Sequence, residues 1–352
     1  MNHIQPKVLV IATSRKTRGG ITSVVLAHEM GQQWKNNRCR WVETHRDGSN
    51  LRKLIYFFSA LFMYICSIPF YNIVHIHVGL NASVRRKLVF AKIAKWFKKP
   101  LIIHFHPATE KHLFDDKFSK DINHLFQLSD LLIVLSNQWI KWINEAYPNN
   151  HFNFQVLYNP CPLVKRAIES KPPYILFAGT LIERKGYDRL LNGFSKISLK
   201  HPDWRLKFAG NGEIVKGKMI AEELGIASKV DFLGWISGQE KHKIFSEASI
   251  YCLPSWGEGF PMGVLDAIAY GIPVLTTPVG GIPDLIKNGE NGYIFDTYNT
   301  EILVEQLNIL VQSKEKRKAI VERADLLLMN EFNLDKIHSK LSSIYEGILN
   351  IK

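Results

Sequence analysis

Short apolar runs alternate with longer amphipathic segments along most of the chain. Runs of this length that are bounded by turn residues predict buried strands, and the longer segments between them predict helices. Strands that alternate with helices predict an α/β protein with parallel sheets. In the first half, the predicted strands are Val8–Ala12, Ile73–His77, Leu101–His106, Leu131–Ser136 and Phe154–Leu157, and the predicted helices are one that ends at His28, Leu51–Ile68 and Val84–Lys99.

The periodicity stops between residues 162 and 172, where prolines and basic residues are closely spaced. It starts again with predicted strands at Tyr174–Ala178, Leu206–Ala209, Val230–Leu233, Ile250–Leu253 and Val274–Thr276. We therefore predict two doubly wound, Rossmann-like domains, residues 1–165 and 172–330. A last helix, Leu334–Leu349, is predicted within a C-terminal segment, residues 331–352.

The stretch 254–286 is predicted to form a loop, a helix, a buried strand and a glycine turn. Proline is tolerated in the first turn of a helix, so we expect this helix to begin near Pro261, with its free amides facing the loop. A helix start of this kind favours an anion. Glu258 lies in the loop, and Asp266 lies eight residues further on, where it can reach hydroxyl groups of a ligand. On a purely structural interpretation, Glu258 caps the helix and Asp266 faces solvent.

A second loop combines glycines with cations, after the predicted strand Tyr174–Ala178. Gly179 and Thr180 open it, and Arg184 and Lys185 come just before Gly186 and a predicted helix. The helix dipole does not favour cations at a helix start unless an anion lies between them. The loop therefore predicts a phosphate site, and a solvated basic pair is the structural alternative.

The first domain offers weaker signals. Gly19 and Gly20 follow the first strand, where ligands bind in doubly wound folds, although a plain turn explains them equally well. Alternation places His75 with His77 on one face of a strand, and His104 with His106 on one face of another. Such pairs suggest a metal, but no carboxylate or cysteine accompanies them, so we expect hydrogen bonds to neighbouring loops and predict no metal site.

Composition narrows the class of protein. The chain has 352 residues, of which 46% are hydrophobic, and this suits two domains with their own cores. Its four cysteines are far apart and predict neither a disulfide framework nor a metal site. The residues before Val8 lack a signal-peptide cleavage site, and we expect a cytoplasmic protein.

The net charge of +13 lies entirely in the first half. No carboxylate occurs between Asp47 and Glu110, a window that holds nine lysines and arginines and implies an anionic partner. The predicted helix Leu51–Ile68 is apolar nearly all round and slightly short for a bilayer span. The next helix, Val84–Lys99, places its basic residues Arg85, Lys92, Lys95 and Lys99 along one side. We expect peripheral attachment to an anionic membrane, with a buried helix beside a solvated basic face as the alternative and a transmembrane span as a further one. We find no nucleic-acid recognition motif.

The stretch around Glu258 and Asp266 resembles the Glu-x7-Glu signature of retaining glycosyltransferases of the GT-B fold, in the group 1 family (family 4) that includes capsule and exopolysaccharide enzymes. Asp266 replaces the second glutamate of this signature, and Thr180 replaces an arginine of the family's phosphate loop. The resemblance implies two Rossmann-like domains that face each other across a cleft. It also implies an acceptor-side first domain, a nucleotide-sugar-binding second domain and a C-terminal helix that packs back on the first domain.

The resemblance further implies roles for individual residues. Glu258, Lys185 and His106, which is followed by Pro107, would act at the reacting sugar, while Arg184 would share the phosphate charge with Lys185. Asp266 would hold the ribose and Ile236 the nucleotide base. The remaining expected donor-binding residues are Gly19, Gly20, Gly179, Thr180, Gly259, Phe260 and Pro261.

We therefore expect a metal-independent hexosyltransferase that uses a UDP- or GDP-sugar and no cofactor. Its acceptor would be a glycan or a lipid-linked molecule in cell-surface polysaccharide synthesis, at the cytoplasmic face of the inner membrane. A non-catalytic nucleotide-sugar-binding scaffold would share the same pocket. A basic adaptor for a membrane or for nucleic acid would depend on residues 48–109 alone.

Overall fold

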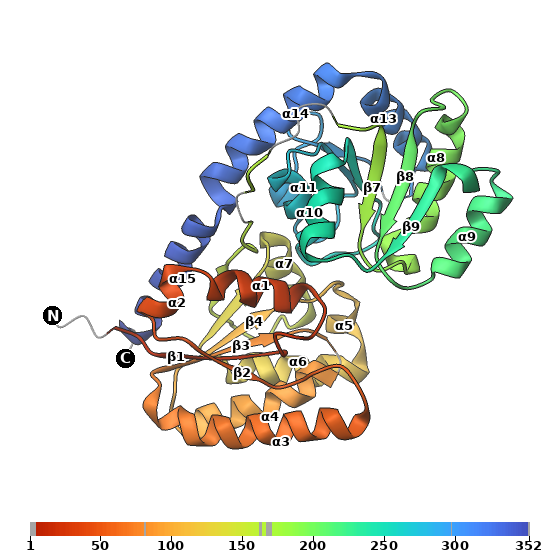
Figure 1. Ribbon diagram of the computed structural model, residues 1–352. Helices are drawn as coiled ribbons and strands as arrows, with labels where there is room; N and C mark the ends of the chain where they lie inside the picture. The colour runs from red at the N-terminus through yellow and green to blue at the C-terminus, as the bar shows by residue number, and fades with distance from the viewer. Residues whose placement is uncertain (1–4, 81, 162–163, 167–170, 297, 351–352) are drawn as a thin grey trace. The chain divides into compact units, whose positions relative to one another are not determined.

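The computed structural model describes residues 5–80, 82–161, 164–166, 171–296 and 298–350. The chain divides into an N-terminal unit, Met1–Pro160 with Phe332–Lys352, and a C-terminal unit, Cys161–Glu331. Each unit contains one six-stranded sheet whose named strands pair in parallel (Figure 1). This confirms the predicted α/β class with two doubly wound sheets. Most of the predicted linker, 162–172, lies outside the described residues.

The sheet of the N-terminal unit has the strand order β2-β1-β3-β4-β5-β6. Its strands are β1 (Val8–Ala12), β2 (Arg40–Glu43), β3 (Ile73–Val78), β4 (Leu101–Phe105), β5 (Leu131–Val134) and β6 (Phe154–Val156). Its helices are α1 (Gly20–Glu29), α2 (Gln32–Asn36), α3 (Asn50–Ser67), the 3-10 turn η1 (Ile68–Phe70), α4 (Ala82–Trp96), α5 (Lys111–Phe114), α6 (Asp116–Leu128), α7 (Asn137–Ala146) and α15 (Leu334–Asn350). Helices α1, α2 and α15 cover one face of the sheet, and α3 and α4 lie on the other side (Figure 1).

Helix α15 joins the hydrophobic core of the N-terminal unit, although it lies at the other end of the sequence. Its buried residues Ile337, Leu341 and Tyr345 belong to the same cluster as Val8 and Val10 of β1. The apolar residues of α15 recur at three- and four-residue intervals, which places them on one face of the helix. The first and last elements of the chain therefore share one core.

The sheet of the C-terminal unit has the strand order β12-β11-β10-β7-β8-β9. Its strands are β7 (Tyr174–Ala178), β8 (Arg205–Ala209), β9 (Val230–Gly234), β10 (Ile250–Leu253), β11 (Val274–Thr276) and β12 (Tyr293–Ile294). Its helical elements are η2 (Glu183–Lys185), α8 (Tyr187–Ser198), α9 (Ile214–Glu223), η3 (Ala227–Lys229), α10 (Gly238–Glu247), α11 (Met262–Ala269), α12 (Ile282–Leu285), α13 (Thr300–Gln312) and α14 (Lys314–Leu327). The π-turn η4 (Leu328–Phe332) leads from this unit to α15.

Helix α3 is neither too short to span a bilayer nor buried in the core of its unit. Together with η1 it forms a helical segment of 21 residues, Asn50–Phe70, that is long and apolar enough to cross a membrane. The prediction that it is too short is therefore wrong on length. Only 22% of its most apolar window is buried, so the alternative of a buried core helix is also wrong. The buried residues Ala60, Tyr64 and Ser67 mark its inner side, and the Tyr64 hydroxyl donates to the carbonyl of Phe90 in α4 at 3.0 Å.

Candidate functional site

Two loops meet at the carboxyl ends of β7 and β10 in the C-terminal unit. These strands are parallel neighbours, with Ile175 opposite Ile250, and the strand order reverses between them. Ligands of doubly wound sheets bind at this kind of switch point, outside the carboxyl ends of the strands. The loop after β7 leads into η2, and the loop after β10 leads into α11. These are the two loops that the sequence singles out.

An ion pair joins the two loops. Nζ of Lys185 lies 2.5 Å from Oε1 of Glu258. The Ser255 hydroxyl donates to the same carboxylate oxygen at 2.6 Å. Glu258 is only 5% exposed, and a buried carboxylate is tolerated where such partners satisfy it. The carboxylate is thus held in place by its two partners, and it does not serve only as a helix cap.

Arg184 lies against the same loop. Its Nη1 donates to the carbonyl of Gly257 and lies 4.0 Å from Oε2 of Glu258. In return, the amide of Trp256 donates to the carbonyl of Arg184 at 2.7 Å. The alternative of a solvated basic pair is therefore wrong, because both cations of this loop contact the segment that carries Glu258.

Glycines allow the close approach of these segments. Gly186 has a φ of +67°, and a Cβ at this position would lie 2.1 Å from the carbonyl oxygen of Pro254. Gly280 has a φ of +60°, and its Cβ would lie 1.8 Å from the carbonyl oxygen of Glu258. The amide of Gly281 donates to the carbonyl of Gly259 at 2.7 Å. Only glycine fits these contacts without moving the backbone. The turn at Gly280 and Gly281 therefore packs directly against the backbone of the Glu258 loop and holds it in place.

Helix α11 begins at Met262 with Pro261 as its N-cap, where the sequence predicts a helix start. Phe260 is 4% exposed and packs at this start. Asp266 lies inside the helix and forms an ion pair of 2.7 Å with Lys241 of α10. The side chain of Asp266 is 15% exposed, so the interpretation that it simply faces solvent is wrong. The structure brings Lys185, Arg184 and Glu258 together, whereas Asp266 has a separate cationic partner.

The remaining predicted donor-binding residues of this unit follow the carboxyl ends of β7 and β9. A Cβ at Gly179 would lie 3.9 Å from Cε of Lys185. Thr180 is exposed beside it. Ile236 follows β9 and is 8% exposed, next to Trp235 at 45%. An exposed aromatic ring beside a buried aliphatic side chain can pack against a planar base.

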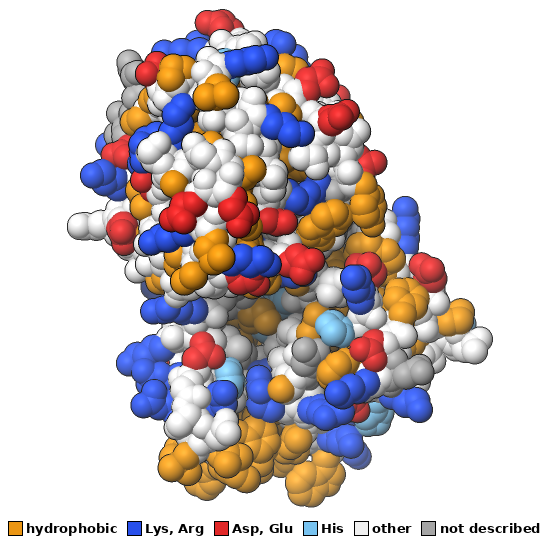
Figure 2. Space-filling model, turned by 90° about the vertical axis from the view of Figure 1, so that its right-hand side faces the viewer, with side chains coloured by type: hydrophobic (Ala, Val, Ile, Leu, Met, Phe, Trp, Pro, Cys, Tyr) orange, Lys and Arg blue, Asp and Glu red, His pale blue; other side chains and the backbone are white. Residues whose placement is uncertain are grey.

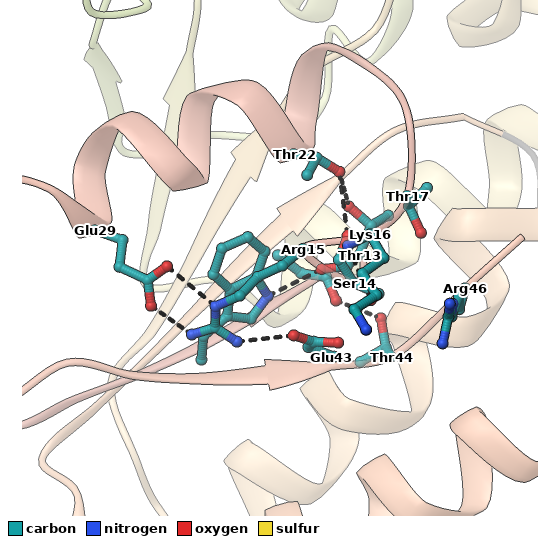
Figure 3. Close-up of polar contacts among 12 residues, drawn as sticks. Thr13, Ser14, Arg15, Lys16, Thr17, Thr22, Glu29, Glu43, Thr44 and Arg46 are labelled. Carbon is teal, nitrogen blue, oxygen red and sulfur yellow. Dashed lines mark hydrogen bonds and ion pairs between the residues drawn. The ribbon is translucent and has the colours of Figure 1, made fainter. Parts of the chain in front are cut away.

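In the N-terminal unit, the loop between β1 and α1 is fixed by Arg15. Its guanidinium pairs with Glu29 of α1 and with Glu43 of β2 (Figure 3). It also stacks 4.3 Å from the centre of the Trp41 ring. Gly19 is the N-cap of α1 with a φ of +143°, and a Cβ at Gly19 or Gly20 would meet no atom within 4 Å. Open space at this helix start can admit a ligand, but in this structure Gly20 has no steric requirement for glycine.

Six histidines form one cluster in the N-terminal unit, which we call the histidine cluster: His28, His75, His77, His104, His106 and His338. Register places His77 of β3 opposite His104 of β4, so the four strand histidines share one face of the sheet. Nδ1 of His77 lies 2.9 Å from Nε2 of the half-buried His106. His28 of α1 and His338 of α15 lie over this face, with ring centroids 5.4 Å apart.

Burial keeps these rings neutral. It lowers the pKa of His75 and of His106 to about 3, and it lowers the pKa of His77 and His104 well below the ordinary value. Both ring nitrogens of His104 are buried without a partner, so the predicted hydrogen bonds to neighbouring loops are wrong for this residue. The rings of His104 and His106 pack 4.0 Å apart instead.

The ring nitrogens of His75, His77 and His104 lie within 4.8 Å of one another and form the group, among the described residues, that could hold a metal ion. Tetrahedral coordination at Zn–N distances of about 2.0 Å requires nitrogens about 3.3 Å apart. The rings would have to move together to share an ion. We therefore assign no metal to the histidine cluster.

Three residues near the Glu258 loop were missed by the sequence reasoning. Ser255 and Lys241 are the partners of Glu258 and Asp266. Arg189 of α8 is 7% exposed, donates to the carbonyl of Pro254 at 3.1 Å and stacks 4.4 Å from the ring of Trp256. Ser255 lies in the glycine-rich loop and could have been found there. No sequence signal identifies the other two, because their partners belong to other elements.

Residues 163–326 match the family model described as glycosyl transferases group 1. An uncharacterized glycosyltransferase of Haemophilus influenzae is 32% identical over 226 residues, which cover 62% of this chain and 61% of that protein. The chain spans about half the length of most of the curated relatives it matches.

Solved structures show the same fold across nearly the whole chain. Sucrose-phosphate synthase from Thermosynechococcus elongatus superposes with a TM-score of 0.81 at 14% identity, over 98% of this chain and all of that one. Anabaena HepE in complex with UDP and glucose gives a TM-score of 0.78 at 15% identity, over 96% of this chain and 99% of that one. Residues 163–326 thus resemble the glycosyl transferases group 1 family, within a chain that has the two-domain GT-B fold.

Proposed function

We propose that this protein is a retaining glycosyltransferase that moves a hexose from a nucleotide-diphospho-sugar to a glycan or lipid-linked acceptor in cell-surface polysaccharide synthesis. The observation that carries the proposal is the Lys185–Glu258 pair at the switch point of the C-terminal sheet. It lies in the segment that matches the glycosyltransferase family.

The proposed chemistry depends on charge. When the bond between sugar and diphosphate breaks, negative charge develops on the leaving phosphate. Lys185 and Arg184, which both contact the Glu258 loop, are proposed to neutralise that charge, together with the free amides at the start of α11. In this proposal these cations make a metal ion unnecessary. Without donor, the Glu258 carboxylate balances Lys185, so the lysine is already ordered before the donor arrives.

Glu258 is proposed to accept hydrogen bonds from the sugar hydroxyls through its second oxygen, Oε2. Lys185 and Ser255 both bond the other oxygen, Oε1. Asp266 is proposed to hold the ribose, and the segment at Trp235 and Ile236 the base. HepE has the same fold and binds UDP and glucose, which supports a UDP-sugar as the first donor to test. A GDP-sugar is the second.

The test is a screen of UDP- and GDP-sugars by product mass, with soluble and lipid-linked acceptors in parallel. We expect one donor to yield a nucleoside diphosphate and a glycosylated acceptor, with the anomeric configuration of the donor kept in the product. Metal independence is tested by repeating the assay with a chelator. A protein that binds a nucleotide sugar but never turns it over is the non-catalytic scaffold, and that result would overturn the proposed activity.

We also propose that the N-terminal unit attaches to an anionic membrane surface through α3. The exposed side chains Leu51, Ile55, Phe58, Phe62 and Ile65 recur every three or four residues and form a stripe along the outer face of this helix. Phe62 is 73% exposed, and Phe70 of η1 and Trp96 at the end of α4 are exposed to 72% and 79%. Figure 2 shows apolar side chains gathered along the lower edge of the N-terminal unit, with lysines and arginines beside them.

Charge and packing both support attachment along the surface. Arg52 and Lys53 lie at the start of α3, in the window without carboxylates. The basic face expected on α4 is smaller than predicted, because Arg85 pairs with Asp121 and Lys95 with Asp130. Tyr64 is fully buried against α4, so a span across the bilayer would have to remove a packed face of α3. An interfacial helix needs no such change.

Vesicle flotation tests this attachment. We expect binding to vesicles with anionic lipid, weakened by salt, and loss of binding in a Phe58→Asp, Phe62→Asp double variant. Leu199→Asp is the matched control, because Leu199 is 90% exposed in the C-terminal unit. Equal flotation of the double variant and wild type would contradict the proposal. Attachment at the anionic cytoplasmic leaflet is the localisation that this implies.

A further inference from the structure

A buried lysine and a half-buried arginine are sequence neighbours in α4, and neither has a counter-ion among the described residues. Lys87 is 1% exposed, and its Nζ contacts the hydroxyl oxygen of Thr44 at 2.5 Å. That hydroxyl donates its own proton to the carbonyl of Ala12 at 2.9 Å. Arg86 is half-buried, and its Nε is buried without a hydrogen-bond partner. In the described part of the chain, neither side chain forms an ion pair with a carboxylate, and no carboxylate is among the charges that shift the pKa of either.

Burying positive charge without a bound anion lowers the free energy of unfolding of the protein. Burial lowers the pKa of Lys87 well below its ordinary value, and Arg86 lowers it further. A buried charge is normally paired, because taking it out of water costs several kcal/mol. A fully buried lysine beside a half-buried arginine, with no anion near them, is therefore better explained by a missing partner than by packing alone.

The pair lies where a doubly wound sheet binds ligands. Thr44 and His45 directly follow β2, and the loop after β1 closes over them, since the amide of Ser14 donates to the carbonyl of His45 at 2.7 Å. Figure 3 shows Lys16, Thr44 and Arg46 grouped at this end of the strands, on the side away from Glu29. Burial is the main reason that the pKa of His45 is lowered, and the positive charges of Arg86 and Lys53 lower it further. Both charges therefore act on the loop that follows β2.

Carboxylates are scarce around this group. Glu43 is engaged by Arg15. Asp47 is exposed and lies 3.4 Å from Nε2 of His45. Between Asp47 and Glu110 the sequence supplies no other carboxylate. Positive charge therefore exceeds negative charge at the carboxyl ends of β1 and β2.

We propose that the N-terminal unit binds a phosphate or diphosphate group of the acceptor at this place, which we call the Arg86 site: Thr44, His45, Arg46, Arg86 and Lys87, with Lys16 beside them. Arg86 makes the main contacts with phosphate oxygens, for which a guanidinium has the matching geometry. Arg46, whose Nη1 donates to the Tyr56 hydroxyl at 3.1 Å, has further N–H donors for the same ligand. Lys87 lies deeper, behind Thr44, and a bound phosphate favours the charged form of the lysine that burial disfavours. The proposal rests on the proposed glycosyl transfer and names its acceptor class, a phosphorylated molecule.

Inorganic pyrophosphate is the probe, in the Lys185→Ala background, so that the phosphate site proposed for the C-terminal unit does not contribute. We expect pyrophosphate to bind this protein and to raise its melting temperature. Arg86→Met should weaken the binding at least about tenfold, which corresponds to one charge-assisted hydrogen bond. Lys120→Met is the matched control, because Lys120 is exposed on α6, and it should bind like the background.

The variant Lys87→Met tests whether Lys87 contributes to phosphate binding or has only a structural role. Replacing an unpaired buried cation with an apolar side chain of similar length should leave the fold intact and raise its stability without ligand. The same variant should also lose affinity for pyrophosphate, because the buried charge behind the site is gone. A stabilised variant with unchanged affinity would overturn the site, as would equal binding by Arg86→Met and the background.

Two further measurements assign the source of the phosphate and keep this proposal separate from the proposed activity. If pyrophosphate competes with flotation on anionic vesicles, the site takes a lipid phosphate, and if it does not, the site takes a soluble phosphorylated acceptor. Arg86→Met should keep hydrolysis of the donor and lose transfer to a phosphorylated acceptor. Absence of donor turnover in wild type would count against the glycosyltransferase but would leave the pyrophosphate result standing.

Discussion

Lys185 and Glu258 are 73 positions apart in the sequence, and their side chains meet at 2.5 Å between Nζ and Oε1. The contact joins the loops after two neighbouring strands at the switch point of the C-terminal sheet. It places a cation for a leaving phosphate directly beside a carboxylate for a sugar. Substitutions at this site and in the elements that support it should therefore have distinct effects on turnover, donor binding and stability.

Lys185→Ala should lower turnover by about 10²–10³, because it removes a charge that stabilises the leaving group. Binding of the donor should weaken less than turnover falls, since the contact strengthens as charge develops on the phosphate. The measurement is steady-state kinetics with the donor found in the screen. Lys200→Ala, an exposed lysine of the same unit, should behave as wild type. Unchanged turnover in Lys185→Ala would remove this residue from the mechanism.

Asp266→Asn should raise the KM for the donor about tenfold and leave kcat within about threefold, if the carboxylate holds the ribose in both the ground state and the transition state. Lys241→Ala is the control for the ion pair of 2.7 Å between the two residues. That pair is partly exposed and is worth about 1 kcal/mol or less, so its loss should shift KM only slightly. Equal KM values for Asp266→Asn and wild type would show that Asp266 has only a structural role, as the ion-pair partner of Lys241 in α10.

The loop geometry makes a prediction about two glycines with nearly the same backbone. Gly186 has a φ of +67° and Gly225 a φ of +68°, but only Gly186 would place a Cβ against backbone, 2.1 Å from the carbonyl oxygen of Pro254. Gly225→Ala should cost about 1–2 kcal/mol from the left-handed conformation alone. Gly186→Ala should cost more in urea unfolding and should also lower turnover, because η2 must move away from the Glu258 loop. Equal losses of stability would contradict the close approach.

The histidine cluster predicts a pH dependence of stability in the N-terminal unit. Folding lowers the pKa of His28, His75, His77, His104, His106 and His338, so the unfolded chain binds more protons below its own pKa of about 6.5. The stability is therefore complete above pH 6.5 and falls as the pH decreases toward about 3. Each strongly shifted histidine contributes up to about 1.4 kcal/mol per pH unit in this window. Tyr345, whose hydroxyl bonds Nδ1 of His75, stays neutral throughout because burial raises its pKa.

Hydrogen exchange of peptides from β3 and β4 measures this effect locally, between pH 7 and 5 and after correction for the intrinsic rate. As the pH is lowered from 7 to 5, the protection should decrease in wild type. It should decrease less in His104→Leu, which removes one buried imidazole. His151→Leu is the control, because His151 is exposed. Protection that is flat between pH 7 and 5 in wild type would contradict the cluster's neutral state.

The strands that the sequence predicted are those with continuous apolar runs, because burial on both faces of a parallel strand demands such a run. The strand β2 was missed, since only Trp41 and Val42 are apolar between Arg40 and Glu43. It lies at the edge of the sheet and is covered in part by Arg15, whose stacking on Trp41 depends on tertiary structure.

The candidate site was predictable in its loops but not in its contacts. Glycines and charges located the segments of Lys185 and Glu258, yet their pairing depends on which strands are neighbours. The same limit applies to the histidines. Alternation along each strand predicted two separate pairs, and only the register of β3 with β4 shows that both pairs lie on one face of the sheet. Lys87 was counted as one of nine basic residues in the acid-free window, and nothing in its local sequence indicates that it is buried.

Crystals soaked with a UDP-sugar or GDP-sugar test the central claim most directly. We predict that the diphosphate lies against η2 and the start of α11, with phosphate oxygens about 2.8 Å from Nζ of Lys185 and from the guanidinium of Arg184. The sugar hydroxyls should then contact Glu258. A diphosphate that is bound elsewhere, with Lys185 still paired only to Glu258, would contradict the proposed mechanism.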